Sequence, residues 1–226
     1  MHYELSLELT MHGLEIYPDT LDAQSCDYII NLFNNDDRKT QGITADGIMD
    51  GRKKSTDVYC NFLHHEFKLY SDIILPAVQT MVDKIKQQYM FLDYCDYWRV
   101  CPWYNIQYYT DGEGYSQAHC EHSSTYPNRM LAWMIYLNNA KCGTEFPYQQ
   151  IKVRALRGQG AMWSAAWTHP HKGVTPNIGD KYIVTGWCEY FDHTRQEERY
   201  LQNTKSDLLP HQSLQWVTDI VRDDTE

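Results

Sequence analysis

The sequence predicts a mainly β fold, an antiparallel sandwich or barrel with helices on its flanks. From residue 97 onward, short runs rich in β-branched and aromatic residues alternate with turn sequences. No helical pattern fits between these runs, which argues against a fold of alternating strands and helices. Helical spacing before and after this region supplies the flanking helices. A chain of 226 residues with this composition is expected to form one globular domain.

The N-terminal part is expected to support the β region. Residues 1–18 alternate in polarity like a strand, and residues 17–36 predict a helix because Asp and Thr capping residues precede an apolar face. Residues 37–56 are polar and contain glycine, which predicts a loop. Residues 66–92 predict a second helix that is bent or begun at Pro76. Its apolar face comprises Ile73, Ile74, Val78, Met81, Val82 and Ile85.

The β region should contain five clear strands. They are predicted within residues 103–109, 129–139, 151–156, 160–166 and 181–191. Turn sequences such as TDGEG, NAKCGT and RGQG separate them. The last residues return to helical spacing. We therefore expect a supporting part at 1–96, a core at 97–192 and a helical extension at 193–226, all within one domain.

Charge and cysteine content argue against several classes of protein. The formal net charge is -10 and the basic residues are scattered, so neither a nucleic acid nor an anionic membrane is an expected partner. Seven cysteines form an odd set without a CxxC pair, as expected for reduced thiols in a cytosol-like compartment. The sequence shows neither a signal-peptide pattern nor an apolar stretch of transmembrane length. We expect a soluble, cytoplasmic protein.

The stretch YSQAHCEHSST contains a candidate metal site. In an extended segment, residues two apart point to the same side, so His119 and Glu121 can reach one metal ion while His122 points away. A third ligand can come from His169 or His171, which lie between the fourth and fifth predicted strands. Two histidines and one carboxylate with open coordination positions form the facial triad of non-haem Fe(II) oxygenases.

Together with this triad, five motifs in order make the sequence resemble the iron(II)/2-oxoglutarate-dependent dioxygenases, and most of all their prolyl 4-hydroxylase-like branch. The motifs are YYTDGEGYSQAHCE, AWMIYLNN, GTEFPYQQ, RGQGAMWSAAWTHPHKG and GDKYIVTGW. They cover residues 97–191, and LDAQSCDYIINLF is similar to the family's entry helix. The resemblance implies a double-stranded β-helix core, which is a jelly roll of the cupin-like kind.

The metal ligands that this resemblance implies are His119, Glu121 and His171. In prolyl 4-hydroxylases a basic residue ten positions after the distal histidine grips the distal carboxylate of 2-oxoglutarate, and Lys181 stands at that position. The strand pattern supports this role independently. Lys181 shares a face with Ile183, Thr185 and Trp187, and an inward ammonium needs an anion.

The resemblance implies further contacts to the cosubstrate. Tyr109 and Tyr136 match tyrosines of the cosubstrate pocket, although both would also suit a plain core role. Thr185 matches a small polar position near the 2-oxoglutarate tail, and Trp187 matches a tryptophan close to the metal. The sequence departs from the usual pattern in two places. Glu121 stands where the family usually has Asp, and the usual GGxT turn reads CGT.

The implied activity is hydroxylation of a C–H bond by an Fe(II)- and 2-oxoglutarate-dependent dioxygenase, with O2 consumed and succinate and CO2 released. Ascorbate is an optional additional cofactor. A peptidyl proline or related amino acid is the expected substrate, and a small-molecule hydroxylase is the alternative. A non-catalytic cupin-like metal-binding protein is a rival that would have no need of Lys181. An aromatic rim of Tyr115, Trp163 and Trp167 is expected to admit the substrate, with residues 40–56 as a lid.

Overall fold

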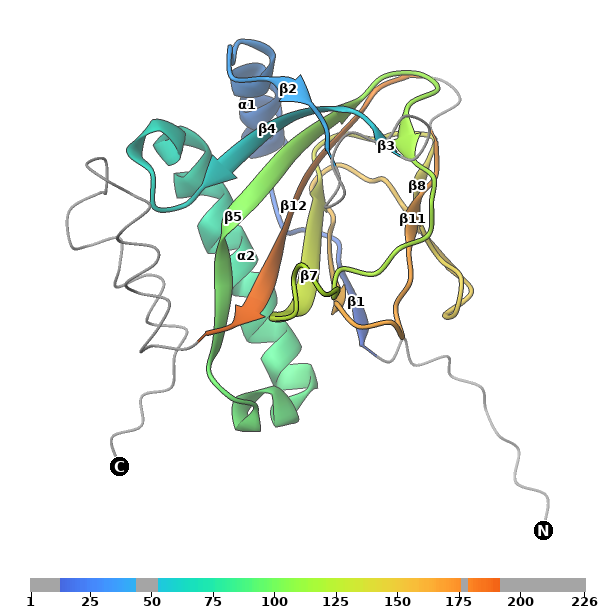
Figure 1. Cartoon of the computed structure of the whole chain (residues 1–226). Coiled ribbons are helices and arrows are strands. Elements are labelled where there is room, and N and C mark those ends of the chain that lie inside the picture. Colours follow the sequence, from blue (N-terminus) through green and yellow to red (C-terminus); the bar gives the residue numbers. More distant parts are fainter. Residues whose placement is uncertain (1–12, 44–52, 176–178, 192–226) are drawn as a thin grey trace.

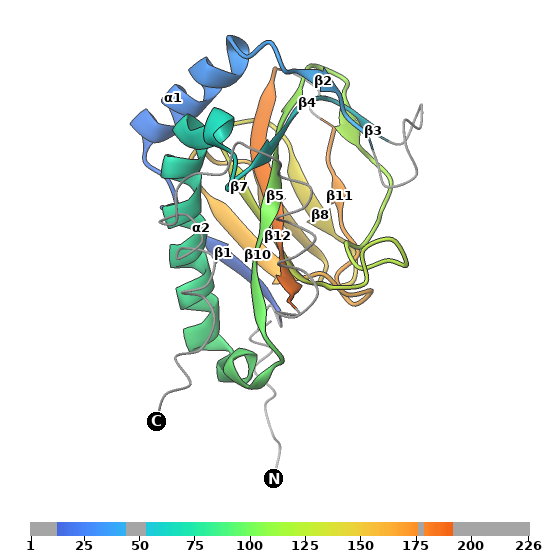
Figure 2. The same ribbon diagram turned by 60° about the vertical axis from the view of Figure 1, so that its left-hand side comes forward.

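The computed structural model describes residues 13–43, 53–175 and 179–191. Its centre is a two-layer β structure in which a large antiparallel sheet packs against a smaller sheet (Figure 1). The two long helices cover the other face of the large sheet (Figure 2). The mainly β jelly-roll core with flanking helices, predicted from the sequence, is therefore confirmed.

The large sheet has the strand order β1-β10-β7-β12-β5-β4-β2, and every neighbouring pair is antiparallel. These strands span, in chain order, Leu14–Tyr17 (β1), Thr40–Gln41 (β2), Thr56–Asn61 (β4), Trp98–Tyr109 (β5), Arg129–Tyr136 (β7), Gly160–Ser164 (β10) and Lys181–Tyr190 (β12). The central position of β12, between β5 and β7, puts its side chains in the middle of both faces of the sheet.

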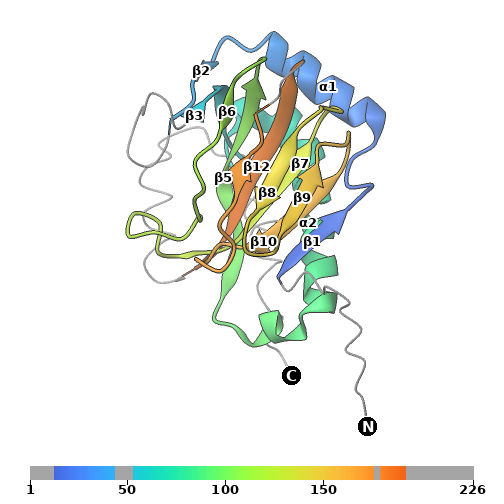
Figure 3. The same ribbon diagram turned by 90° about the vertical axis from the view of Figure 1, so that its right-hand side faces the viewer.

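The smaller sheet faces the large one on the side away from the helices (Figure 3). It contains β8 (Gly143–Phe146), β9 (Ile151–Arg154) and β11 (Lys172–Gly173), in the order β11-β8-β9. A separate two-stranded ladder joins β3 (Lys53–Lys54) to β6 (Gly114–Tyr115). An apolar cluster that includes Phe146, Trp163 and Ile183 fills the space between the layers.

Two helices pack on the outer face of the large sheet. Helix α1 (Ala23–Asn34) begins at Asp22, whose carboxylate accepts a hydrogen bond from the backbone N–H of Ser25 at 2.7 Å. Helix α2 (Lys68–Gln88) follows the short 3-10 turn η1 (His65–Phe67) and leads into a second one, η2 (Met90–Tyr94). Both helices bury one apolar stripe in the larger core cluster, as the periodicity predicted.

Several details differ from the sequence prediction. The region 37–56 is not wholly a loop, because β2, β3 and the start of β4 lie in it, and β8 begins inside the predicted turn. Pro76 neither begins α2 nor ends it but lies within the helix. At the altered CGT turn, a side chain on Gly143 would collide with the carbonyl of Val153, so the glycine that remains is the one that packing requires.

Three expectations fall outside the described residues: the strand in residues 1–12, most of the lid segment, and the helical extension at 193–226. Among the residues that the structure does describe, no helix is both long and apolar enough to cross a bilayer.

Candidate active site

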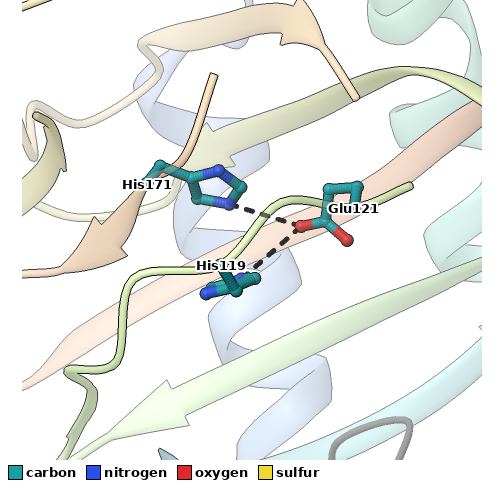
Figure 4. Close-up of side chains that lie close together, drawn as sticks. All are labelled: His119, Glu121 and His171. Atoms are coloured by element: carbon teal, nitrogen blue, oxygen red, sulfur yellow. Dashed lines mark ion pairs between the residues drawn. The ribbon is translucent and has the colours of Figure 1, made fainter. Parts of the chain in front are cut away.

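His119, Glu121 and His171 converge at one point between the two sheets, although none lies in a named strand (Figure 4). The backbones of His119 and His171 pair as an isolated antiparallel bridge, with N–H to carbonyl distances of 3.0 Å and 2.8 Å. The backbone N–H of Glu121 donates to the carbonyl of Ala165 at 3.1 Å. These bonds fix the two segments side by side, so ligands more than 45 residues apart in sequence meet.

The hydrogen bonds of both imidazoles leave their Nε2 atoms free to bind a metal. Nδ1 of His119 lies 3.0 Å from the carbonyl oxygen of Gln117, and Nδ1 of His171 lies 3.2 Å from that of His169. A carbonyl oxygen can only accept, so Nδ1 carries the proton and a neutral ring keeps its lone pair on Nε2. Burial lowers the pKa of His119 to about 4, which keeps this ring neutral at physiological pH.

The three converging atoms fit a metal ion. Oε1 of Glu121 lies 3.3 Å from Nε2 of His171 and 3.7 Å from Nε2 of His119. Burial alone would raise the pKa of Glu121, but the groups around it outweigh burial and hold that pKa well below its usual range. The Nε2 lone pairs of the two histidines and the negative carboxylate oxygen of Glu121 thus point toward one place. A cation bound there would interact favourably with all three. Cis ligands on bonds of about 2.1 Å lie about 3 Å apart, close to these separations.

The second carboxylate oxygen of Glu121 is held by two other donors. Nε1 of Trp187 donates to Oε2 at 2.8 Å, and a guanidinium nitrogen of Arg129 donates to it at 3.2 Å. The guanidinium itself lies between the rings of Trp187 and Tyr126, 3.6 Å and 3.8 Å from their centroids. Oε2 is therefore occupied, and only Oε1 faces the histidines. This arrangement also shows how the site accommodates the extra methylene of Glu relative to Asp.

The triad opens into a cavity of about 820 Å³ that has Lys181 among its lining residues. Lys181 is only 3% exposed, and its Nζ lies 4.5 Å from the centre of the Tyr109 ring. Burial lowers the pKa of Lys181, and no carboxylate among the described residues forms an ion pair with it. Ile183, Thr185 and Trp187 line the same cavity, which confirms the shared strand face. A buried cation of this kind is stabilised by an anion, which no carboxylate of the described residues supplies.

The predicted cosubstrate residues differ in how they meet this cavity. Tyr109 lines it with its ring, because its hydroxyl donates to Gln107 at 2.7 Å. Tyr136 lies behind the wall and shares a hydrogen bond of 2.7 Å with the hydroxyl of Thr144, which does reach the cavity. Thr185 donates its hydroxyl to the backbone carbonyl of Trp133 at 3.0 Å. Thr144, which the sequence reasoning missed, therefore separates Tyr136 from the cavity.

The expected aromatic rim is only partly right. Tyr115 lines the cavity and stacks on the His119 ring, with centroids 3.8 Å apart and planes at 15°. Trp163 is buried and packs edge-on against His171, so it belongs to the wall behind the triad. Trp167 is 74% exposed and does not line the cavity. Half-exposed aromatic residues at the cavity are instead Trp103 and Tyr126.

The two spare histidines lie outside the cluster. His122 is exposed, and its backbone N–H, like that of Glu121, donates to Ala165. His169 is buried, and its Nδ1 lies 2.9 Å from the hydroxyl of Thr168. The structure therefore brings His171, and not His169, to His119 and Glu121.

Comparison with solved structures shows the same fold in prolyl hydroxylases. A Pseudomonas putida prolyl-4-hydroxylase is 14% identical, covers 80% of this chain and 95% of its own, and has a TM-score of 0.62. A Trichoplax adhaerens prolyl hydroxylase, solved with a hypoxia inducible factor peptide fragment, is 15% identical over 85% and 88% of the two chains, also at 0.62. The 2-oxoglutarate complex of a viral collagen prolyl hydroxylase from Paramecium Bursaria Chlorella virus-1 is 16% identical over 79% and 97%, at 0.56.

A match to a protein family identifies the chemistry. No curated protein sequence is significantly similar to the chain. Residues 104–189 match the 2OG-Fe(II) oxygenase superfamily, and this segment contains the whole His-Glu-His cluster and Lys181. Residues 104–189 are thus a 2OG-Fe(II) oxygenase domain, and the chain is a 2-oxoglutarate-dependent dioxygenase that uses Fe(II), 2-oxoglutarate and O2.

Proposed function

We propose that the chain hydroxylates a C–H bond of a prolyl residue in a peptide, or of a related amino-acid substrate. His119, Glu121 and His171 hold Fe(II), and Lys181 binds the distal carboxylate of 2-oxoglutarate. One molecule each of 2-oxoglutarate, O2 and the substrate C–H compound becomes succinate, CO2 and the alcohol. The observation that carries this proposal is the triad on a cavity whose lining includes a buried lysine without a carboxylate partner.

The bound metal and cosubstrate supply the oxidising chemistry, and the protein supplies position. Lys181 orients the cosubstrate through charge, while the ring of Tyr109 covers the lysine and keeps water from it. Trp187 and Arg129 hold the outer oxygen of Glu121, so the inner oxygen is the one that would be available to the metal. Trp163 and its neighbours close the space behind His171. Each of these contacts is made by groups of the protein itself, as expected of a preorganised site.

A peptide substrate is supported by the size and shape of the cavity. Its volume of about 820 Å³ lies near the upper end of the usual range for small-ligand pockets, about 300–1,000 Å³, so cosubstrate and a side chain fit together. Trp103 and Tyr126 offer half-exposed aromatic surface at the cavity, which suits a proline ring. The similar fold of a prolyl hydroxylase solved with a peptide adds support.

The proposed roles of the two parts of the chain follow from the positions of their helices and strands. Residues 97–192 form the catalytic core, because the triad, Lys181 and the lining strands β5 and β12 all lie within them. Residues 1–96 support that core through α1 and α2, which pack on the outer face of the large sheet. They also contribute β4, which lies beside β5. The whole is one domain, since the larger apolar cluster contains side chains from both parts.

The test has two stages. Under anaerobic conditions, Fe(II) and 2-oxoglutarate should together produce the visible charge-transfer band of a bidentate 2-oxo acid. Iron binding without this band would favour a cupin-like protein that only stores or carries metal. Succinate formation should then be measured with proline-rich peptides and with free amino acids in parallel. Stimulation by peptides supports the proposal, whereas stimulation by free amino acids alone assigns a small-molecule hydroxylase.

A further inference from the structure

A buried ion pair outside the triad has no part in the function proposed so far. Lys53 and Asp57 are 7% and 0% exposed, and the ammonium Nζ lies 2.6 Å from Oδ2 of the carboxylate. Ser55 donates to the other oxygen, Oδ1, at 2.7 Å, and Gln107 approaches Oδ2 at 3.4 Å. Asp57 therefore has donors on both oxygens, and the pair is anchored near the start of strand β4, beside β5.

The lysine of this pair connects the large sheet to the small β3–β6 ladder. Lys53 belongs to β3, and its backbone pairs with that of Tyr115 in β6. Its ammonium also donates to the carbonyl of Ile43 at 3.3 Å. One side chain thus connects β3 both to Asp57 and to Ile43, which lies just after β2. Strand β3 has only two residues, so backbone pairing alone would hold it weakly.

The ladder in turn carries the residue that stacks on a metal ligand. Tyr115, opposite Lys53, lies flat against the His119 ring, with centroids 3.8 Å apart. His119 lies in an irregular segment, and outside its own backbone its ring is oriented by Tyr115, by the Gln117 carbonyl and by the His171 ring, of which only Tyr115 stacks on it. Neighbours that orient a ligating histidine contribute to metal affinity without touching the metal.

We propose that the Lys53–Asp57 pair is a positioning device for the metal site: it seats β3, and through β3 and β6 it holds Tyr115 against His119. Lys53 also lines the cavity, but its ammonium is held by Asp57, so we assign both as positioning residues and not as ligands of metal or substrate. This inference rests on the assignment of His119 as a metal ligand in the proposed function. It predicts that the pair contributes to metal affinity, whereas a merely structural pair would contribute to stability alone.

The chain provides a matched control one residue away. Lys54 is in the same strand, but its side chain is 74% exposed and its ion pair with Glu113, at 3.2 Å, lies at the surface. Lys53→Met and Lys54→Met remove the same charge from neighbouring positions. Mn(II), which does not react with O2 under these conditions, serves as the probe, with free Mn(II) counted by electron paramagnetic resonance. Lys53→Met should weaken Mn(II) binding about tenfold, and Lys54→Met should leave it within about twofold.

Two further variants separate positioning from stability. Lys53→Met leaves a buried carboxylate unpaired and should lower the melting temperature. Lys53→Met/Asp57→Asn removes both charges and should recover most of the melting temperature while Mn(II) binding stays weak. Tyr115→Ala should weaken Mn(II) binding about as much as Lys53→Met, and combining these two should add little, because both act through the same ring.

Each failure has a distinct meaning. Three results would each overturn the positioning role. They are unchanged Mn(II) affinity in Lys53→Met, full recovery of both Mn(II) affinity and melting temperature in the double variant, and additive losses of affinity when Lys53→Met is combined with Tyr115→Ala. Failure of the proposed function would appear earlier, as wild-type protein whose Mn(II) binding does not depend on His119. A His119→Ala variant measured beside the others makes that distinction.

Discussion

Lys181→Met is the substitution that tests the cosubstrate site most directly. Methionine has nearly the length of lysine but no charge, so the packing against the Tyr109 ring is kept while the cation is lost. In the structure this cation is 3% exposed and has no carboxylate partner among the described residues. A buried charge without a partner is costly, so 2-oxoglutarate is expected to offset that cost by bringing the anion.

The two consequences have opposite signs. Removing one member of a buried, hydrogen-bonded charge pair costs about 2–5 kcal/mol of binding, so the dissociation constant of 2-oxoglutarate should rise about 30-fold to more than 1,000-fold. The free energy of unfolding of the ligand-free protein should instead stay the same or rise by about 1 kcal/mol, because a desolvated charge is gone. A variant that is more stable yet binds cosubstrate poorly would be hard to explain by damage to the fold.

The pH dependence gives a further check. Burial lowers the pKa of Lys181 below its ordinary 10.5, so the ammonium loses its proton at a lower pH than a free lysine would. Affinity for 2-oxoglutarate should be full below this depressed pKa and fall as pH rises through it, and Lys181→Met should lack this step. The folded state binds this proton less tightly than the unfolded state. The stability cost of Lys181 is therefore present at neutral pH and relieved between the depressed pKa and 10.5.

Calorimetric titration of 2-oxoglutarate into the Mn(II)-loaded protein, with Mn(II) affinity measured separately, provides the assay. Mn(II) affinity should change by less than about threefold, because no ligand is removed. Unchanged 2-oxoglutarate affinity in Lys181→Met would refute the assignment and give the carboxylate to another cation of the cavity, for which Arg129 is the candidate.

Four further substitutions test the triad, its outer contacts and the fold. His171→Ala should abolish metal binding and turnover, whereas His169→Ala should keep metal and at least part of the turnover; the reverse pattern would move the triad. Trp187→Phe removes the donor to Oε2 of Glu121 and should weaken Mn(II) binding about tenfold, and an unchanged value would mean that the guanidinium alone fixes this oxygen. Pro76→Ala in helix α2 should raise the free energy of unfolding by about 1–3 kcal/mol, measured by urea denaturation. An unchanged or lower value would mean that the helix depends on a bend at this residue.

The long, periodic elements of the fold could be predicted from sequence, and the short ones could not. Helix α1 has both an Asp22 cap and an apolar stripe, and the strands around Ile135 and Val184 are runs rich in apolar residues that are buried on both faces of the sheet, so local patterns predict them. Strands β2, β3, β6 and β11 have two residues each, which is too short for any period to appear. They exist because a neighbouring strand supplies the partner, and Pro76 is tolerated in α2 because packing along the helix outweighs one lost hydrogen bond.

The site shows the same division between local spacing and tertiary contact. The His119–Glu121 spacing and the ten-residue step from His171 to Lys181 are local, and both were found. Arg129 and Asp57 carry no such signal, because a charged residue near the end of a strand or next to a loop is ordinarily solvated. Their roles arise only when β7 lies beside β12 and β4 beside β5, which brings the guanidinium of Arg129 to Glu121 and the carboxylate of Asp57 between its donors. The proposed metal ligands were thus indicated by sequence spacing together with the family resemblance, whereas the groups around them depend on strand order. The Lys53–Asp57 ion pair lies outside the metal-binding motif. Substitutions in this pair can therefore test the positioning of the metal site independently of the chemistry at that site.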